Sequence, residues 1–248
     1  MKKVIVTGGA KGIGKAICED QIKRGNFPII LDLDKENACL NIRRWSDQFS
    51  VTADFIKADV TDWQSMETAA AQAEDKHGKI DILVVNAGVS HRASFDELGP
   101  KLWQKTIDIN LTGAFFTVKA FYRHFTEYRE EADGRIIFIT SGSAITGTGG
   151  GAHYAASKAG NHGLMRALSK DLKRTGTTVN AIAPRVIATE LFDDLYPEQK
   201  NRDAILNSIP VGRFGTPEDV ASLVNYLCSE EASYIHGQIL LLDGGRTY

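Results

Sequence analysis

The sequence contains few cysteines, and their arrangement argues against both disulfides and metal sites. There are three in 248 residues: Cys18, Cys39 and Cys228. An odd number of widely scattered cysteines matches neither a disulfide framework nor a zinc motif. Such cysteines are typical of small buried side chains in a reducing compartment. We therefore expect a cytoplasmic protein without a metal.

Long apolar runs and excess charge are also missing. No apolar stretch approaches the ~20 residues of a membrane-spanning helix, and Met1-Lys-Lys-Val-Ile5 leads into a β-rich run rather than a signal sequence. The formal net charge of −2 gives no reason to expect nucleic acid or an anionic membrane as a partner. We expect a small-molecule substrate instead. The length and the 43% hydrophobic content suit one large domain, residues 1–248, without repeats or linkers.

Apolar runs alternate with helical segments along the whole chain. The expected strands end at Val6, Asp32, Ala58, Val85, Thr140, Ile182 and Leu242. The expected helices cover about 13–24, 35–49, 61–77 (with a capping box at Thr61), 101–128, 152–174 and 217–229. This pattern predicts an α/β fold: a single Rossmann-like doubly wound domain of seven mostly parallel strands, order 3-2-1-4-5-6-7, with helices on both faces. Residues that follow the strands then share one crevice at the carboxyl edge of the sheet.

A glycine-rich turn, Thr7-Gly-Gly-Ala-Lys-Gly-Ile-Gly14, follows the first strand. Glycines let the backbone approach a pyrophosphate, and the next helix offers free N–H groups. The spacing of Gly8, Gly12 and Gly14 is Gly-x-x-x-Gly-x-Gly, and such a turn also occurs as a tight loop without a ligand. The flanking strand and helix favour dinucleotide binding, with Ile13 among the contacts.

Acidic and basic residues near this turn bear on the choice between NAD and NADP. Asp32 ends the second strand, 24 residues past Gly8, where an acid reaches the adenosine ribose and repels a 2′-phosphate. Lys11 acts in the opposite direction, because a cation in the glycine turn can pair with that phosphate. We give Asp32 more weight and expect NAD. Asp34 competes with Asp32 for this role but more readily caps the helix at Lys35.

Further candidate cofactor contacts follow later strands. Asp59 comes after the third strand and either bonds the adenine amino group or caps the next turn; both interpretations stay open. The fourth strand ends in Asn86-Ala-Gly88. The remaining expected cofactor contacts are Val60, Tyr154, Lys158, Pro184 and Thr189.

Three side chains between positions 141 and 158 carry the candidate chemistry. Tyr154 and Lys158 are four residues apart in a predicted helix and therefore share a face. An ammonium beside a phenol lowers the phenol pKa, which suits the tyrosine to general acid–base work. Ser141 follows a strand, where its hydroxyl can bond a substrate oxygen. A Tyr-x-x-x-Lys pair by itself is more often ordinary helix surface.

Two further segments are unusual. Asn110 and Gly113 lie inside a predicted helix, although helix interiors tolerate both poorly. A kink or local widening there would free a carbonyl and aim Asn110 inward. Residues 190–210 are polar with scattered aromatics, which fits either a substrate lid or a plain surface helical hairpin.

Taken together, these motifs resemble the short-chain dehydrogenase/reductase family over nearly the whole chain. Thr7, Gly8, Gly12 and Gly14 match the family's glycine motif, Asp59 its adenine-side acid, and 86–88 its Asn-Ala-Gly. Asn110, Ser141, Tyr154 and Lys158 match its catalytic residues. The resemblance implies that Tyr154 exchanges the hydroxyl proton, Ser141 holds the substrate oxygen, Lys158 tunes the tyrosine and bonds the nicotinamide ribose, and Asn110 positions a relay water. It also implies a homotetramer, or a homodimer.

One residue departs from the family pattern. Where the family has Pro-Gly after the sixth strand, this chain has Pro184-Arg185, which loses glycine's tolerance of positive φ. Arg185 either points to solvent or meets an anionic group of the substrate. His91, Arg92, Ser143 and His153 are further candidate polar groups of the substrate pocket.

These observations lead to three functional hypotheses. The first is an NAD-dependent dehydrogenase of a small polar alcohol: a sugar, a polyol or a hydroxy acid. The second is a 3-oxoacyl-thioester reductase, which would favour NADPH and a less polar pocket. The third, a non-catalytic dinucleotide sensor, is disfavoured because all four catalytic-type residues are present.

Overall fold

Seven strands form one sheet in the order β3-β2-β1-β4-β5-β6-β7, and every neighbouring pair is parallel. This confirms the predicted fold class and strand order. The computed structural model describes residues 1–49, 52–126, 133–190, 192, 196 and 198–247. The strands are β1 (Lys3–Thr7), β2 (Phe27–Asp32), β3 (Asp54–Lys57), β4 (Ile82–Val85), β5 (Arg135–Ile139), β6 (Thr178–Pro184) and β7 (Ile239–Leu242).

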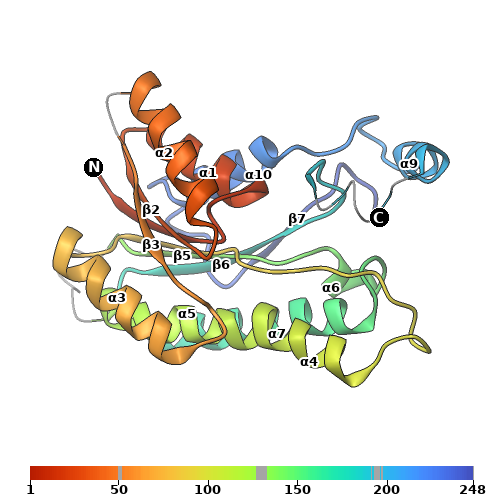
Figure 1. The fold of residues 1–248 in the computed structure, drawn as a ribbon, viewed down its shortest axis with the longest axis horizontal. Helices are drawn as coiled ribbons and strands as arrows, with labels where there is room; N and C mark the ends of the chain where they lie inside the picture. The colour runs from red at the N-terminus through yellow and green to blue at the C-terminus, as the bar shows by residue number, and fades with distance from the viewer. Residues whose placement is uncertain (50–51, 127–132, 191, 193–195, 197, 248) are drawn as a thin grey trace.

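Helices cover both faces of this sheet (Figure 1). One face carries α1 (Gly12–Lys23), α2 (Lys35–Gln48) and α10 (Pro217–Leu227). The other carries α3 (Trp63–His77), α4 (Pro100–Ile107), α5 (Gly113–Phe121) and α7 (Ala152–Asp171). The short α6 (Ser143–Thr146) and α9 (Gln199–Leu206) lie at the end of the molecule where the C-terminus is found. Within the described part of the chain, no helix is long and apolar enough to cross a bilayer.

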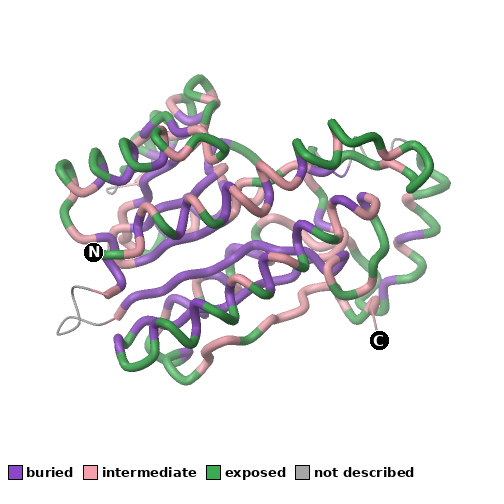
Figure 2. The backbone as a smooth tube through the Cα atoms, turned by 90° about the horizontal axis from the view of Figure 1, so that it is seen from below, coloured by how far each residue is buried: buried purple, intermediate pink, exposed green. Residues whose placement is uncertain are grey.

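Side chains of each strand enter two separate cores in alternation. Val4 and Val6 pack with α1 and α10, whereas Ile5 packs with α3, α5 and α7. Because strand side chains point to opposite faces in turn and both faces are covered, these strands consist of unbroken apolar runs. Burying each such side chain contributes about 1.5–3 kcal/mol. Figure 2 shows the strands as the buried centre of the molecule.

Two helix boundaries differ from the sequence-based expectation. Asp62, not Thr61, caps α3, because its carboxylate accepts the Gln64 N–H at 3.0 Å while the Thr61 hydroxyl donates to Asp59 at 2.7 Å. The helix expected to reach Arg174 ends at Asp171. Arg174 adopts a φ of 63°, which helical backbone does not allow.

The helix expected over 101–128 is interrupted at the predicted place. Between α4 and α5, residues Asp108–Thr112 form a π-helical turn, and a 3₁₀ turn covers Tyr122–Phe125 after α5; positions 127 and 128 fall outside the described residues. The local widening expected near Asn110 is therefore confirmed. A Cβ on Gly113 would lie 2.8 Å from Val60, so the small residue lets the widened turn pack closely against the segment after β3.

Candidate active site

Two adjoining cavities lie along the carboxyl edge of the sheet. We call the larger one the groove, with a volume of about 570 Å³, and the smaller one the pocket, with about 210 Å³. Both are lined by Ile13, Thr140, Tyr154 and Thr189, so these four residues lie at the boundary. The expected cofactor residues that line the groove are Gly8, Lys11, Gly12, Ile13, Asp32, Asp59, Val60, Asn86, Gly88, Tyr154, Lys158 and Thr189.

The glycine turn fits an anionic, extended ligand such as a dinucleotide. Gly8 and Gly12 have φ values of 65° and 50°, and a Cβ on Gly12 would meet only Thr189, at 3.9 Å. A Cβ on Gly14 would lie 2.1 Å from the Gly8 carbonyl, so Gly14 serves packing rather than lining the groove. The N-cap residue of α1, Lys11, makes no capping hydrogen bond with its side chain. The first N–H groups of α1 and the positive end of its dipole are those that bind phosphates in other proteins.

Asn86 braces the glycine turn instead of pointing freely into the groove. Its side-chain Nδ2 donates to the Thr7 and Gly8 carbonyls at 2.9 and 3.1 Å. The Thr7 hydroxyl in turn accepts the backbone N–H groups of Asn86 and Ala87 at 3.0 and 3.1 Å. These bonds fix the ends of β1 and β4 to each other, and they give Thr7 a positioning role.

Charges at the far end of the groove are largely acidic. The Asp32 carboxylate accepts the backbone N–H groups of Ala10 and Asp34, each at 3.0 Å. Lys11 pairs with Asp34 at 2.8 Å, and this contact, with help from Asn37, lowers the pKa of Asp34 to about 2. Asp34 also caps α2 through the Asn37 N–H at 3.1 Å, as predicted. The charge of Lys11 is thus neutralised by Asp34, whereas the Asp32 carboxylate accepts hydrogen bonds from two backbone N–H groups.

Asp59 caps the turn that follows β3. Its Oδ1 accepts both the backbone N–H and the hydroxyl of Thr61, at 2.9 and 2.7 Å. This confirms the capping interpretation for one carboxylate oxygen. Because Asp59 also lines the groove, a contact with the adenine amino group stays a prediction.

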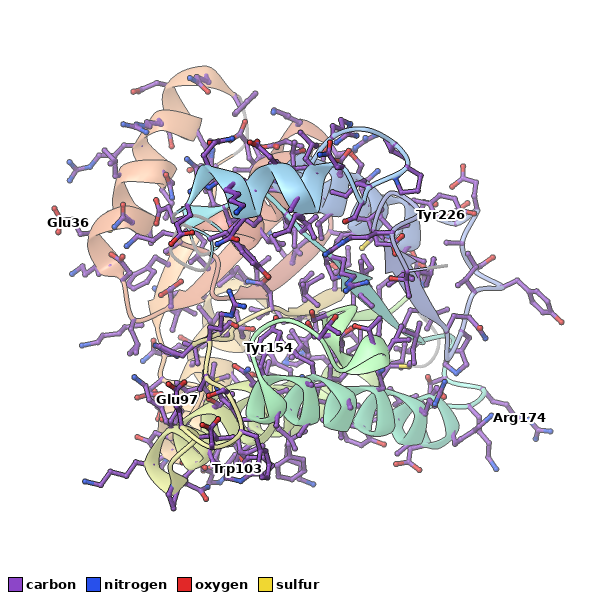
Figure 3. The ribbon with its side chains drawn as sticks, turned by 90° about the vertical axis from the view of Figure 1, so that its right-hand side faces the viewer. Glu36, Glu97, Trp103, Tyr154, Arg174 and Tyr226 are labelled. Carbon is purple, nitrogen blue, oxygen red and sulfur yellow. The ribbon has the colours of Figure 1, made fainter. Side chains whose placement is uncertain are left out.

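Ser141, Tyr154 and Lys158 come together where the groove meets the pocket. The Ser141 hydroxyl hydrogen-bonds the Tyr154 side chain. The Lys158 Nζ donates to the Ile139 carbonyl at 3.1 Å and lies 5.9 Å from the Tyr154 ring centroid. Ser141 and Lys158 are 7% and 5% exposed, so both act in a largely dry environment. Figure 3 shows Tyr154 above the first turns of α7, facing the space between the two helical layers.

Burial dominates the titration of this group of side chains. It raises the pKa of Tyr154, and the hydrogen bond from Ser141 opposes that shift only in part. It lowers the pKa of Lys158 to about 8. The pKa of Tyr154 therefore shifts in the opposite direction from the one predicted, because desolvation of the phenolate outweighs the other effects.

Asn110 points inward as expected, but its side-chain amide already hydrogen-bonds other groups of the protein. Its side chain accepts the Val89 N–H at 2.8 Å and donates to the Val89 carbonyl at 2.9 Å. The widened turn was predicted to free a backbone carbonyl. The backbone carbonyl of Asn110 accepts a hydrogen bond from Nδ2 of Asn161 at 2.9 Å. A Cβ on Gly88 would lie 3.1 Å from both Asn110 Oδ1 and Lys158 Nζ, so glycine permits their approach. A role for Asn110 in holding a relay water stays a prediction.

The candidate substrate residues divide into two groups. Ser143 and Arg185 line the pocket. His153 and Arg92 do not. His153 is wholly buried, because consecutive helix residues face different directions and Tyr154 takes the pocket side. Arg92 is exposed, as is its neighbour His91, and its guanidinium lies 5.9 Å from the ring of Tyr196 at the pocket rim.

Arg185 belongs to the pocket wall. Its Nη2 donates to the Thr148 hydroxyl at 2.7 Å and its Nη1 to the Thr247 hydroxyl at 3.0 Å. The loss of glycine's tolerance of positive φ at position 185 has no cost, because Arg185 is not among the residues with positive φ. The left-handed residue is Val186, with φ 58°, and a β-branched residue there is strained.

Two pocket residues, Arg246 and Thr148, carried no recognisable signal in the sequence. Arg246 comes from the segment after β7, and Thr148 from the loop after α6. From the segment proposed as a lid, Phe192 and Tyr196 line the pocket, whereas positions 191, 193–195 and 197 fall outside the described residues. Pro184 lines the pocket, and its expected contact with the cofactor stays a prediction.

Comparisons with known proteins agree with this geometry. The family described as enoyl-(acyl carrier protein) reductase matches residues 8–247. The 3-oxoacyl-[acyl-carrier-protein] reductase of Thermotoga maritima is 35% identical over 98% of this chain and 97% of its own. The L-rhamnose 1-dehydrogenase (NAD(P)(+)) of Azotobacter vinelandii is 34% identical over 98% and 96%. The solved structure of a short-chain glucose/ribitol dehydrogenase from Brucella melitensis superposes with a TM-score of 0.91 at 31% identity, covering 100% of this chain and 97% of that one.

Proposed function

Because this chain belongs to the short-chain dehydrogenase/reductase family, whose members are oxidoreductases acting on CH–OH groups, we propose that it transfers a hydride between NAD(H) and a small polar secondary alcohol or ketone. The observation that carries the choice of a polar substrate is the position of Arg185. Arg185 lines the same pocket of about 210 Å³ as Ser141 and Tyr154, and its guanidinium hydrogen-bonds Thr148, another residue of that lining. A guanidinium beside the reacting position is costly for an aliphatic chain and favourable for a polar one.

The proposed mechanism assigns one task to each side chain. The nicotinamide cofactor supplies or accepts the hydride when it is bound. Ser141 holds the substrate oxygen by a hydrogen bond, and Tyr154 takes the hydroxyl proton in oxidation or returns it in reduction. The buried ammonium of Lys158 stabilises negative charge on the phenol oxygen, an effect that is strong because the surroundings are dry. Asn110 positions the segment around Val89 beneath the groove.

NAD is the proposed cofactor, for an electrostatic reason. The far end of the groove holds the Asp32 and Asp34 carboxylates, and Lys11 is engaged by Asp34. A 2′-phosphate would bring about two negative charges toward this acidic end. A free ribose hydroxyl, in contrast, can donate to a carboxylate.

Replacing Asp32 by asparagine removes the charge and keeps the shape. We expect Asp32→Asn to raise the NADP-to-NAD ratio of kcat/KM about tenfold or more, equivalent to ~1.4 kcal/mol of lost repulsion. Steady-state kinetics with both dinucleotides measures the ratio. Asp34→Asn is the companion variant, because it frees Lys11 without touching Asp32. If only Asp34→Asn changes the ratio, the Lys11–Asp34 pair rather than Asp32 sets the preference.

A second candidate is reduction of a 3-oxoacyl thioester with NADPH. It is favoured by the full-length similarity to the Thermotoga maritima reductase, which is as high as the similarity to the rhamnose dehydrogenase. Against it stand the acidic end of the groove and the guanidinium in the pocket.

An absorbance assay at the NADH band tests both candidates. NAD and NADP are supplied in turn with sugars, polyols and hydroxy acids, and NADH and NADPH with an acetoacetyl thioester. NAD-linked oxidation of a polar alcohol is the expected result. Rapid NADPH-linked reduction of the thioester, with no oxidation of polar alcohols, would establish the second candidate instead.

Assembly and location are further parts of the proposal. Trp103 on α4 and Phe115 on α5 are 39% and 47% exposed on one helical layer, which suits contact between subunits of a homodimer or homotetramer. The buried free thiols of Cys18 and Cys228 suit a reducing cytoplasm.

A further inference from the structure

Two arginines from separate parts of the chain line the pocket together. Arg185 directly follows β6, and Arg246 lies four residues beyond the end of β7. They are close enough that the charge of Arg246 contributes to lowering the pKa of the Arg185 guanidinium, after burial. Like charges repel, so placing two of them in one small cavity costs free energy unless a ligand offsets it.

Neither guanidinium is neutralised by an ion pair within the described residues. Arg185 donates to the hydroxyls of Thr148 and Thr247, and Arg246 Nε donates to the Ser208 hydroxyl at 2.8 Å. The acid with the clearest influence on Arg185 is Asp243. Its two oxygens accept the backbone N–H groups of Gly245 and Thr247, at 2.9 and 2.8 Å. The hydroxyl contacts orient both cations without cancelling their charge.

The segment that carries Arg246 is held in a defined conformation. Gly244 and Gly245 have φ values of 63° and 86°, so the chain turns back immediately after β7. The Gly244 carbonyl accepts the Val211 N–H at 3.1 Å, and the Asp243 carboxylate bridges the turn. The Ser208 hydroxyl then fixes the guanidinium. Arg246 is therefore a positioned wall residue rather than a loose terminal side chain.

We propose that Arg185 and Arg246 form a binding site for a terminal oxyanion of the substrate, so that the enzyme acts on short hydroxy acids and their oxo forms rather than on neutral sugars or polyols. This inference rests on the proposed function and names its substrate class. Guanidinium groups bind carboxylate, sulfonate and phosphate oxygens through paired N–H donors.

The Arg185 side chain lies close to the residue that is proposed to hold the reacting oxygen. Arg185 packs its aliphatic stem over Gly142, where a Cβ would lie 2.7 Å from Arg185 Cγ, and Gly142 directly follows Ser141. The Arg185 stem therefore packs beside the residue that follows Ser141, and Ser141 and Arg185 line the same pocket. A pocket of about 210 Å³ suits a small molecule whose hydroxyl lies at Ser141 and whose anionic end lies at Arg185.

Paired substrates test this proposal. Initial rates with NAD are measured for β-hydroxybutyrate and its amide, for hydroxypropanesulfonate and propanediol, and for glycerol phosphate and glycerol. For at least one pair, we expect the anionic member to be preferred in kcat/KM. In Arg185→Gln this preference should fall about 10–100-fold, the effect of losing a charge-assisted hydrogen bond, and in Arg246→Gln about tenfold. The three pairs distinguish carboxylate, sulfonate and phosphate.

Binding is measured separately from turnover. Each anionic compound is titrated calorimetrically into the protein saturated with NADH, a complex that cannot oxidise an alcohol. Arg185→Lys should bind better than Arg185→Gln, because it retains the charge. Arg174→Gln is the control: Arg174 is exposed and lies at the opposite end of α7 from Tyr154 in Figure 3. It should leave both the binding and the preference unchanged.

The possible outcomes separate the inference from the proposed function. Oxidation of neutral alcohols in preference to all three anions would overturn the inference and leave the proposed function standing. Binding of an anion that Arg185→Gln abolishes, without oxidation of any alcohol, would support the inference and overturn the proposed function. If no anion binds and none reacts, the inference fails.

Discussion

Replacing Tyr154 by phenylalanine should lower kcat by about a thousandfold, because positioned general acid–base groups contribute about 10²–10⁴-fold. The change removes one hydroxyl, and NADH binding should persist, since the groove is formed mainly by other residues. Turnover is measured with the substrate that the NAD-linked assay identifies, and NADH binding by fluorescence titration.

Tyr226→Phe is the matched control. Tyr226 is 45% exposed on α10, so its loss removes a similar hydroxyl away from both cavities. Equal turnover in wild-type protein and Tyr154→Phe would refute the catalytic assignment. If Tyr154→Phe instead loses turnover but keeps the biological role in cells, the hypothesis of a non-catalytic dinucleotide sensor is supported.

Replacing Lys158 by methionine should produce a protein that is more stable and much less active. Burial depresses the pKa of this lysine from 10.5 to about 8. At one pKa unit per 1.36 kcal/mol, keeping the ammonium buried below pH 8 costs ~3 kcal/mol. Methionine avoids that cost but gives up the hydrogen bond to the Ile139 carbonyl, worth about 1 kcal/mol. We expect a net gain of ~2 kcal/mol at pH 7, with turnover reduced about 100-fold or more because the stabilising charge is gone.

The pH dependence distinguishes this explanation from a simple packing effect. Between pH 8 and 10.5 the unfolded chain holds a proton that the folded protein has released. The wild-type free energy of unfolding therefore rises with pH across this interval, and the advantage of Lys158→Met shrinks. Urea unfolding at pH 7 and pH 10 measures both proteins, with Lys170→Met, an exposed lysine on the same helix, as control. A Lys158→Met protein that is less stable at both pH values would contradict the buried-charge argument.

The sheet and the position of the central site were predictable because they follow from local rules. A parallel strand that is covered on both faces must be apolar throughout, so runs such as Ile82–Val85 indicate both a strand and its depth. Polar residues that directly follow such runs, Ser141 among them, then lie at one edge. Asn110 and Gly113 marked the widened turn because helix interiors disfavour them.

The rest depended on contacts between distant segments. The pairing of Lys11 with Asp34 joins residues 23 positions apart and reduces the weight of Lys11 in the cofactor argument. Arg246 lies beyond the last strand, and no period or motif indicates that its turn folds back toward Ser208. The prediction that His153 lines the pocket was wrong for a different reason. His153 is one residue from Tyr154, so the sequence already implied that it lies on a different helix face. The direction of the Tyr154 pKa shift required knowledge of its burial, which charge spacing alone does not give.

The four residues that line both the groove and the pocket affect the choice of positions for directed evolution of this enzyme. Ile13, Thr140, Tyr154 and Thr189 line both cavities, so substitutions there alter cofactor and substrate binding together. Arg185, Tyr196 and Arg246 line only the pocket. A mutant library restricted to these three positions explores new substrates while the dinucleotide site keeps its lining.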